Sequence, residues 1–227
     1  MKYSFDFAAP LAYWPDLVAG AWTTLALALS STFFGFLVGV FCALATTGHA
    51  KWLARLAGVY IEVIRNTPLL VQVFIVYFGL SSLGFQVGAF TAATVALVVN
   101  VGAYTSEIVR AGIESIPRSQ LEAAECLALS RWQMLRHVVL PPAIERVFPA
   151  LTSQYVLLML ASSICSQISA EELTAVANRI QSDTFRSVET YLIVAVAYLA
   201  MSLVMRAVFW LVGLVAFPRR RRLGTPL

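Results

Sequence analysis

Four long stretches of the chain contain no charged residue, and this pattern limits the fold more than any other feature. They run from residue 17 to 50, from 66 to 106, from 147 to 170 and from 190 to 205. Each holds all or most of the roughly 20 helical residues that cross about 30 Å of hydrocarbon. Only 12% of the residues are charged and 59% are hydrophobic, whereas about a quarter of the residues in soluble domains are charged. The chain is therefore predicted to lie in a membrane.

The second stretch is about twice the length of one span, and small residues between 79 and 88 interrupt it near its middle. Such a cluster indicates a tight turn, so we predict two helices there. The expected fold is an all-α membrane protein with five transmembrane helices in a single domain, residues 1–227. The predicted spans cover about 18–46, 59–80, 88–109, 146–168 and 190–217.

Positive residues are divided unevenly between the segments that connect these spans. Because cytoplasmic segments are enriched in Lys and Arg, the amino terminus is predicted outside and the carboxyl terminus in the cytoplasm. The basic tail is interpreted as a topology anchor, and no nucleic acid partner is expected, because no aromatic-interleaved basic surface accompanies the tail. The basic residues on the predicted cytoplasmic side are Lys51, Arg55, Arg110, Arg118, Arg131, Arg136, Arg146 and Arg219 to Arg222.

The predicted cytoplasmic loop, about residues 111–142, is expected to contain two short helices outside the bilayer. Ser119 with Glu122 has the spacing of a capping box, and so has Ser130 with Gln133. In such a box each side chain bonds a backbone N–H at the start of a helix. These boxes predict where the two helices begin.

Prolines are expected to bound this loop: Pro117 precedes the first helix, and Pro141 and Pro142 are predicted to end the second. The first helix places small Ala123 and Ala124 beside Glu122, a shape suited to docking in the groove of a basic partner. An amphipathic helix lying on lipid headgroups would have the same pattern, and the residues alone do not separate the two interpretations.

Motifs in this loop resemble those of a known family. Residues 122–124 read Glu-Ala-Ala, Ala128 follows where a glycine is usual, and residues 139–141 read Val-Leu-Pro. The pattern resembles the "EAA…G…I-x-L-P" loop of ATP-binding-cassette (ABC) importer permeases. The runs 62–72 and 102–113 are similar to the polar amino acid branch of that family, which includes histidine, glutamine and glutamate permeases.

The resemblance implies a type I ABC importer permease fold with a coupling-helix loop, in the bacterial inner membrane. It implies two ATP-binding-cassette ATPase subunits, a second permease subunit that is identical or homologous, and a periplasmic solute-binding protein that delivers a polar amino acid. No cofactor is expected on this chain, because ATP and Mg belong to the partner ATPase. The residues expected to contact the ATPase are Glu122, Ala123, Ala124, Leu127 and Ala128.

Polar residues inside the predicted spans are candidates for a solute path. Pro68 lacks a backbone donor, so a bend is predicted there, and broken helices in membranes often line such paths. Hydrogen bonding between helices and close packing are the alternative roles. The candidates are Thr67, Gln72, Asn100, Ser162 and Ser163.

Charged residues near the cytoplasmic span ends are expected to form two structural ion pairs, Glu62 with Arg65 and Glu107 with Arg110. Arg206 lies deep enough in the last span to need a partner or to extend toward the membrane surface. No acidic residue lies within a predicted span away from its ends, and we therefore favour neutral or acidic amino acids as solutes.

Other functions find little support in the sequence. No metal-ligand spacing, serine elbow or phosphate-binding loop is present, so an enzyme is not expected and ATP hydrolysis must come from another polypeptide. An ion-gradient-driven transporter or channel is the alternative function. It fits less well, because the spans show no internal repeat and no intramembrane acidic residue to carry a proton.

Overall fold

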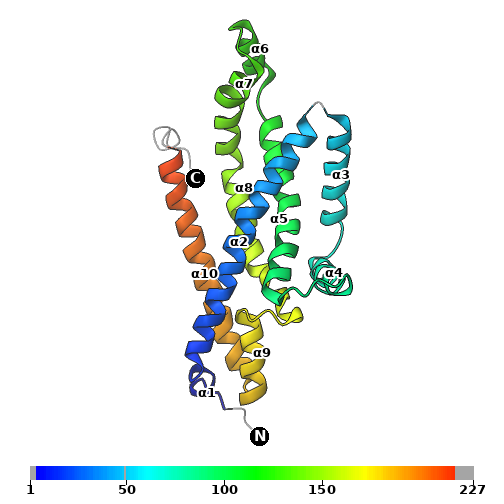
Figure 1. Ribbon diagram of the computed structural model, residues 1–227. Coiled ribbons are helices and arrows are strands. Elements are labelled where there is room, and N and C mark those ends of the chain that lie inside the picture. The colour runs from blue at the N-terminus through cyan, green and yellow to red at the C-terminus, as the bar shows by residue number, and fades with distance from the viewer. Residues whose placement is uncertain (1–3, 49, 218–227) are drawn as a thin grey trace.

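The computed structural model describes residues 4–48 and 50–217, and every regular element in this part of the chain is helical. Figure 1 shows a long bundle with α6 and α7 projecting at one end and α1 and α9 at the other. Arg219 to Arg222, interpreted above as a topology anchor, lie outside the described residues. The elements are α1 (Ala8–Leu11), α2 (Trp14–Thr47), α3 (Lys51–Arg65), α4 (Leu69–Ser82), α5 (Ala89–Glu114), α6 (Arg118–Cys126), α7 (Arg131–Met134), a π-helical turn (Leu135–Val139), α8 (Leu140–Ala161), a 3₁₀ segment (Ser162–Ile168), α9 (Leu173–Thr184) and α10 (Ser187–Ala216).

Four helical stretches are long and apolar enough to cross a membrane: α2, α5, residues 131–168 and α10. Helices α3 and α4 pass the same test only together, and they are bent by 109° at the break between them. The all-α fold with four to five membrane helices is thus confirmed. The bend expected at Pro68, within the span predicted over 59–80, is a complete break between two helices.

Glycines allow α2 and α5 to cross closely. Gly35 and Gly39 on α2 are spaced as a G-x-x-x-G pair, which brings helix backbones together in membranes. A Cβ atom on Gly39 would lie 2.6 Å from Thr105 Cβ of α5, and one on Gly35 would overlap Val101 Cγ1. The centre of the bundle therefore depends on the absence of side chains at these two positions.

The sequence predicted that the second loop helix ends at Pro141 and Pro142. In the structure the helix continues through both prolines. The π-helical turn Leu135–Val139 joins α7 to α8, and the two prolines occupy the first turn of α8. Neither proline has an N–H to donate to the turn before it, and that turn is the π-helical one. The chain consequently runs as one long helical stretch from the loop into the membrane.

Helix α9 was not predicted from the sequence. It packs against α2 through buried apolar residues, and its start is capped by Glu172, whose carboxylate accepts hydrogen bonds from the backbone N–H groups of Thr174 and Ala175, both at 2.9 Å. The Tyr198 hydroxyl donates to the same carboxylate at 2.7 Å. Glu172 is fully buried, and no described cation lies within ion-pair distance of it.

Burial raises the pKa of the Glu172 carboxyl above its ordinary range, and the three hydrogen bonds only partly offset this. A raised pKa means that the folded state favours the protonated form, so the stabilisation is present at low pH and is lost as the pH rises. We expect thermal stability to fall as the pH rises above about 4.3, the ordinary pKa of a Glu carboxyl, and Glu172→Gln to flatten that decline. Thermal unfolding of both proteins across this range checks it. The exposed neighbour supplies the control, Glu171→Gln, which should leave the profile unchanged; equal slopes for all three proteins would contradict the assignment.

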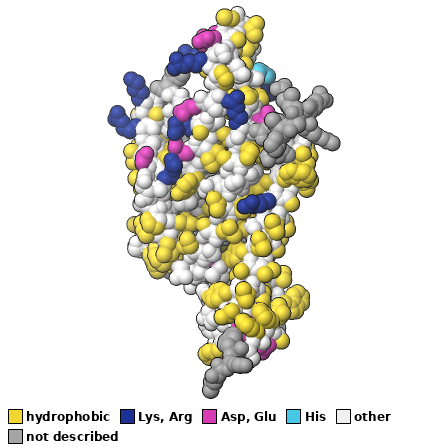
Figure 2. Space-filling model, turned by 180° about the vertical axis from the view of Figure 1, so that it is seen from behind, with side chains coloured by type: hydrophobic (Ala, Val, Ile, Leu, Met, Phe, Trp, Pro, Cys, Tyr) yellow, Lys and Arg dark blue, Asp and Glu magenta, His cyan; other side chains and the backbone are white. Residues whose placement is uncertain are grey.

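Charged side chains collect toward the ends of the bundle. Figure 2 shows the basic side chains gathered toward the end that carries α6, with apolar side chains over most of the middle. At the opposite end Arg179 of α9 pairs with Asp16 of α2 at 3.2 Å, and Arg186 lies 3.6 Å from Glu189. The bundle thus has an apolar middle and two polar ends of different charge.

Candidate docking site and solute path

Helix α6 projects from the bundle (Figure 1) and is held to it by an apolar contact, and the neighbouring end of α5 is held by hydrogen bonds. Leu121 of α6 packs on a small core made by Ile116, Val139 and Ala143, which joins the end of α5 to the start of α8. Arg146 of α8 donates hydrogen bonds to the backbone oxygen of Ser115 and, at 3.0 Å, to its hydroxyl, and thereby caps α5. Helix α6 is therefore joined directly to the end of α5 and the start of α8.

The outer surface of α6 is small and partly apolar. Glu122, Ala123 and Ala128 are exposed, and Leu127 has 74% of its surface exposed. Ala124 is only 3% exposed and faces the protein interior, so its predicted contact with a partner is wrong. Its small side chain instead lets α6 lie close to the loop. The surface formed by Glu122, Ala123, Leu127 and Ala128 is called the docking face below.

Only one of the two predicted capping boxes forms. The Ser130 hydroxyl accepts from the Gln133 N–H at 3.3 Å, and the Gln133 side chain accepts from the Ser130 N–H at 2.8 Å. The Ser119–Glu122 box is wrong, because α6 begins directly after Pro117 and Ser119 already lies inside its first turn. The fixed φ of Pro117 and its extended ψ start the helix without a side-chain cap.

Ala128 terminates α6 in a strained conformation. Its φ is +53°, in the left-handed region that favours glycine, and Leu129 N–H closes the end of the helix by donating to Ala124 O at 3.2 Å. A glycine here is what the family motif would supply. The alanine therefore costs about 1 kcal/mol relative to an unstrained residue.

We expect Ala128→Gly to stabilise α6 by about 1 kcal/mol, which slows exchange of its amide hydrogens roughly fivefold. Hydrogen–deuterium exchange of peptides that span residues 118–129 measures this. The matched control is Ala123→Gly, the same change at a helical position, which should speed exchange because glycine disfavours helix. Faster exchange in Ala128→Gly would contradict the strain.

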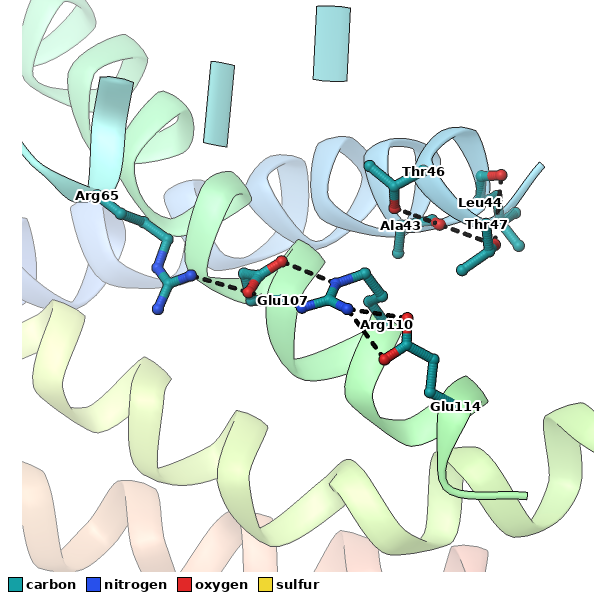
Figure 3. A network of polar contacts seen from close by, with 8 residues as sticks. All are labelled: Ala43, Leu44, Thr46, Thr47, Arg65, Glu107, Arg110 and Glu114. Atoms are coloured by element: carbon teal, nitrogen blue, oxygen red, sulfur yellow. Dashed lines mark hydrogen bonds and ion pairs between the residues drawn. The ribbon is translucent and has the colours of Figure 1, made fainter. Parts of the chain in front are cut away.

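A network of ion pairs joins α3 to α5 near the loop (Figure 3). Glu107 lies at its centre: its carboxylate accepts from Arg65 NH1 of α3 and from Arg110 Nε, each at 2.9 Å. Arg110 also pairs with Glu114 at 2.8 Å. The predicted pair of Glu107 and Arg110 is therefore confirmed. The predicted pair of Arg65 and Glu62 is wrong, because Arg65 pairs with Glu107 of α5 instead.

The break between α3 and α4 is closed by two buried amides. Gln72 Nε2 donates to Ile64 O at 2.8 Å and to Thr67 O at 3.0 Å, so it replaces backbone donors that the break removes. Its Oε1 accepts from Asn100 Nδ2 of α5 at 2.9 Å. Thr67, Gln72 and Asn100 thus come together in one network, with Gln72 and Asn100 buried. Their amide hydrogen bonds hold the break in place.

Ser162 and Ser163 do not join this network. The Ser162 hydroxyl donates to Met159 O at 2.7 Å and the Ser163 hydroxyl to Leu160 O at 2.8 Å, both within the end of α8. Ser162 is fully buried. Ser163 is half-buried and lines a shallow groove with residues of α9 and α10.

Two residues of this region escaped the sequence analysis. Glu114 extends the ion-pair network and Arg146 caps α5. Glu114 stands four residues after Arg110, a spacing that places the two on one helix face and could have revealed the pair. Nothing in the sequence links Arg146 to Ser115, because their contact depends on how α8 leaves the loop.

Residues 35–216 match the family described as binding-protein-dependent transport system inner membrane component. The chain belongs to this family. A solved amino acid ABC transporter with histidines is similar over 93% of this chain and 99% of its own, with 38% sequence identity and a TM-score of 0.87. The methionine ABC transporter MetNI, in an inward-facing form, shares the permease fold with a TM-score of 0.73 over 88% of this chain and 95% of its own, at 22% identity.

Relatives of this permease are similar along most of their length. The glutamine transport system permease of Escherichia coli is 37% identical, over 88% of this chain and 93% of the relative. The nopaline transport system permease of Agrobacterium fabrum is 36% identical, over 87% of this chain and 88% of the relative. The type I importer permease fold is therefore confirmed, and the loop with α6 is this permease's copy of the coupling-helix region typical of the family.

Proposed function

We propose that this permease is the membrane subunit of an ATP-driven importer that moves a polar amino acid into the cytoplasm by alternating access. The observation that carries the proposal is the exposed docking face on a helix fixed firmly to the span ends. The family match and the relatives, which include transport system permeases for glutamine and arginine, support a polar amino acid as solute. Two ATPase subunits, a second permease subunit and a periplasmic binding protein are the partners proposed.

The proposed mechanism uses the loop as a lever. ATP binding closes the two ATPase subunits, which hold the ATP and its Mg, and the docking faces move with them. Leu121 and the cap on Ser115 make α6 move together with the ends of α5 and α8. The ion pair of Glu107 with Arg65 extends that motion to α3. The span bundle then changes from inward-facing to outward-facing and accepts solute from the binding protein.

The proposed orientation places α6 in the cytoplasm of the bacterium, with the permease in the inner membrane. Basic side chains concentrated at the α6 end support this side as cytoplasmic (Figure 2). The amino terminus would then be periplasmic and the carboxyl terminus cytoplasmic. The binding protein would approach the end that carries α1 and α9.

The function is tested by reconstituting the permease with the ATPase and the binding protein proposed as its partners. Proteoliposomes should take up one or more labelled amino acids from a panel when ATP is supplied to the ATPase. A proton gradient without ATP should drive no uptake. Gradient-driven uptake that needs no ATP would contradict the proposal and support a secondary transporter.

A further inference from the structure

A hollow between α8 and α10 contains a positive charge deep in the apolar part of the bundle. It encloses about 220 Å³ and is lined by Thr152 and Ser153 of α8, by Arg206 of α10 and by aromatic side chains. Arg206 lies about ten residues before the end of α10 at Ala216, or roughly 15 Å along the helix, about half the thickness of the hydrocarbon layer.

No acidic side chain in the described part of the chain neutralises Arg206. Its side chain is exposed, and it forms no ion pair with any residue in 4–48 or 50–217. The spanning parts of α8 and α10 that flank it, from residue 147 and from residue 190, contain no Asp or Glu. An identical second permease subunit has no intramembrane acidic residue to offer either. Within residues 4–48 and 50–217 the charge therefore has no acidic partner, and an identical subunit would supply none inside the membrane.

A bare guanidinium facing lipid at this depth costs about 3 kcal/mol, and arginines inside spans therefore nearly always face a protein interior or a water-filled cavity. Arg206 lines a cavity of this kind, together with the hydroxyl-bearing residues Thr152 and Ser153. Phe148, Phe209 and Trp210 supply apolar surface that lowers the local dielectric, which strengthens any charge-assisted bond made there. Ser153, an exposed residue that lines the same hollow, supplies a hydroxyl as a further donor.

We propose that this hollow binds the carboxylate of the amino acid in transit, with Arg206 as the charge-bearing residue and Ser153 beside it. The inference rests on the proposed function. A planar guanidinium offers two parallel N–H donors that match a carboxylate. The hollow is smaller than the roughly 300–1,000 Å³ of sites for drug-sized ligands, which suits one end of a small solute. Since every amino acid has an α-carboxylate, the site selects for the class and against cations that lack one.

The test measures binding of radiolabelled glutamine and, separately, of radiolabelled arginine to the purified permease–ATPase complex without binding protein; these are the solutes named for two relatives. Arg206→Gln should weaken binding about tenfold or more, because it removes a charge-assisted pair. Arg206→Lys should weaken it less, since it keeps the charge but not the paired donors. The matched control is Arg55→Gln, which removes one positive charge from the exposed face of α3 and should bind as the wild type does.

Binding within twofold of wild type in Arg206→Gln would overturn the proposal, and so would a wild-type complex that transports the amino acid but binds none. Where Arg206→Gln fails to assemble, Arg206→Met is measured under the same criterion. A lipid phosphate is the other anion that could occupy the hollow. Binding measured in nanodiscs with and without phosphatidylglycerol distinguishes it from the carboxylate of the amino acid. If the Arg206→Gln effect appears only with that lipid, a lipid phosphate occupies the hollow and the proposal is wrong. A wild type that fails to transport with ATP would instead contradict the proposed function.

Discussion

Leucine in place of Gly39 is expected to break the contact between α2 and α5 and to leave little folded protein. Even the first atom of the new side chain would lie 2.6 Å from Thr105 Cγ2 and 2.9 Å from Gly102 O, closer than real Cβ atoms approach their neighbours. The second of these atoms belongs to the backbone and cannot rotate away. Overpacking of this kind costs about 1–3 kcal/mol when side chains can adjust, and more when helices must separate.

The measurement for Gly39→Leu is the yield of monodisperse protein and its melting temperature in detergent. We expect the yield to collapse, or the melting temperature to fall by about 4 °C or more. Gly58 provides the control, since nothing lies within 4 Å of a Cβ built on it, and Gly58→Leu should leave both quantities nearly unchanged. Equal behaviour of the two variants would show that α2 and α5 do not need to approach so closely.

Reversal of charge at Glu122 is expected to separate the permease from its motor while the membrane part stays folded. Glu122 is exposed on the docking face and takes part in none of the ion pairs of the described chain. A lysine there would oppose the basic partner proposed for this face. Like charges in an interface cost several kcal/mol, so association should weaken roughly thirtyfold or more.

Co-purification of the ATPase with Glu122→Lys, and transport by the remaining complex, measure this effect. Glu171→Lys makes the same charge change at an exposed position just before α9, the helix that lies at the end of the bundle opposite α6 (Figure 1), and it should keep the ATPase bound. Glu122→Gln should fall between Glu122→Lys and the wild type if the charge itself matters. An unchanged amount of bound ATPase in Glu122→Lys would contradict docking at α6.

Sequence reasoning succeeded where one physical rule acts alone. Charge-free stretches located the spanning helices because lipid tolerates so few charges, and the Ser130–Gln133 box formed because it needs only four consecutive residues. The bend predicted at Pro68 lies where the sequence placed it, but the change in helix direction is larger than a bend. A bend becomes a 109° break only because Gln72 is present to satisfy the carbonyls that the break exposes.

The failures involve contacts between distant segments. Arg65 has an acidic neighbour three residues away and still pairs with Glu107, forty-two positions along the chain. Pro141 and Pro142 look like a helix end until the π-helical turn before them is known. Helix α9 carries too few apolar residues to resemble a span, and its burial against α2 is a consequence of how the bundle closes.

The break between α3 and α4 has a mechanical consequence. Gln72 of α4 bonds to the end of α3, and Asn100 of α5 bonds to Gln72, so the two arms form a bracket whose angle is set by hydrogen bonds and not by a flexible turn. The Glu107–Arg65 pair holds the end of the α3 arm to α5. Under the proposed mechanism, a shift of α5 along its own axis would act on the junction of α3 and α4 through these bonds. Because the two helices differ in direction by 109°, the same shift would displace α4 sideways.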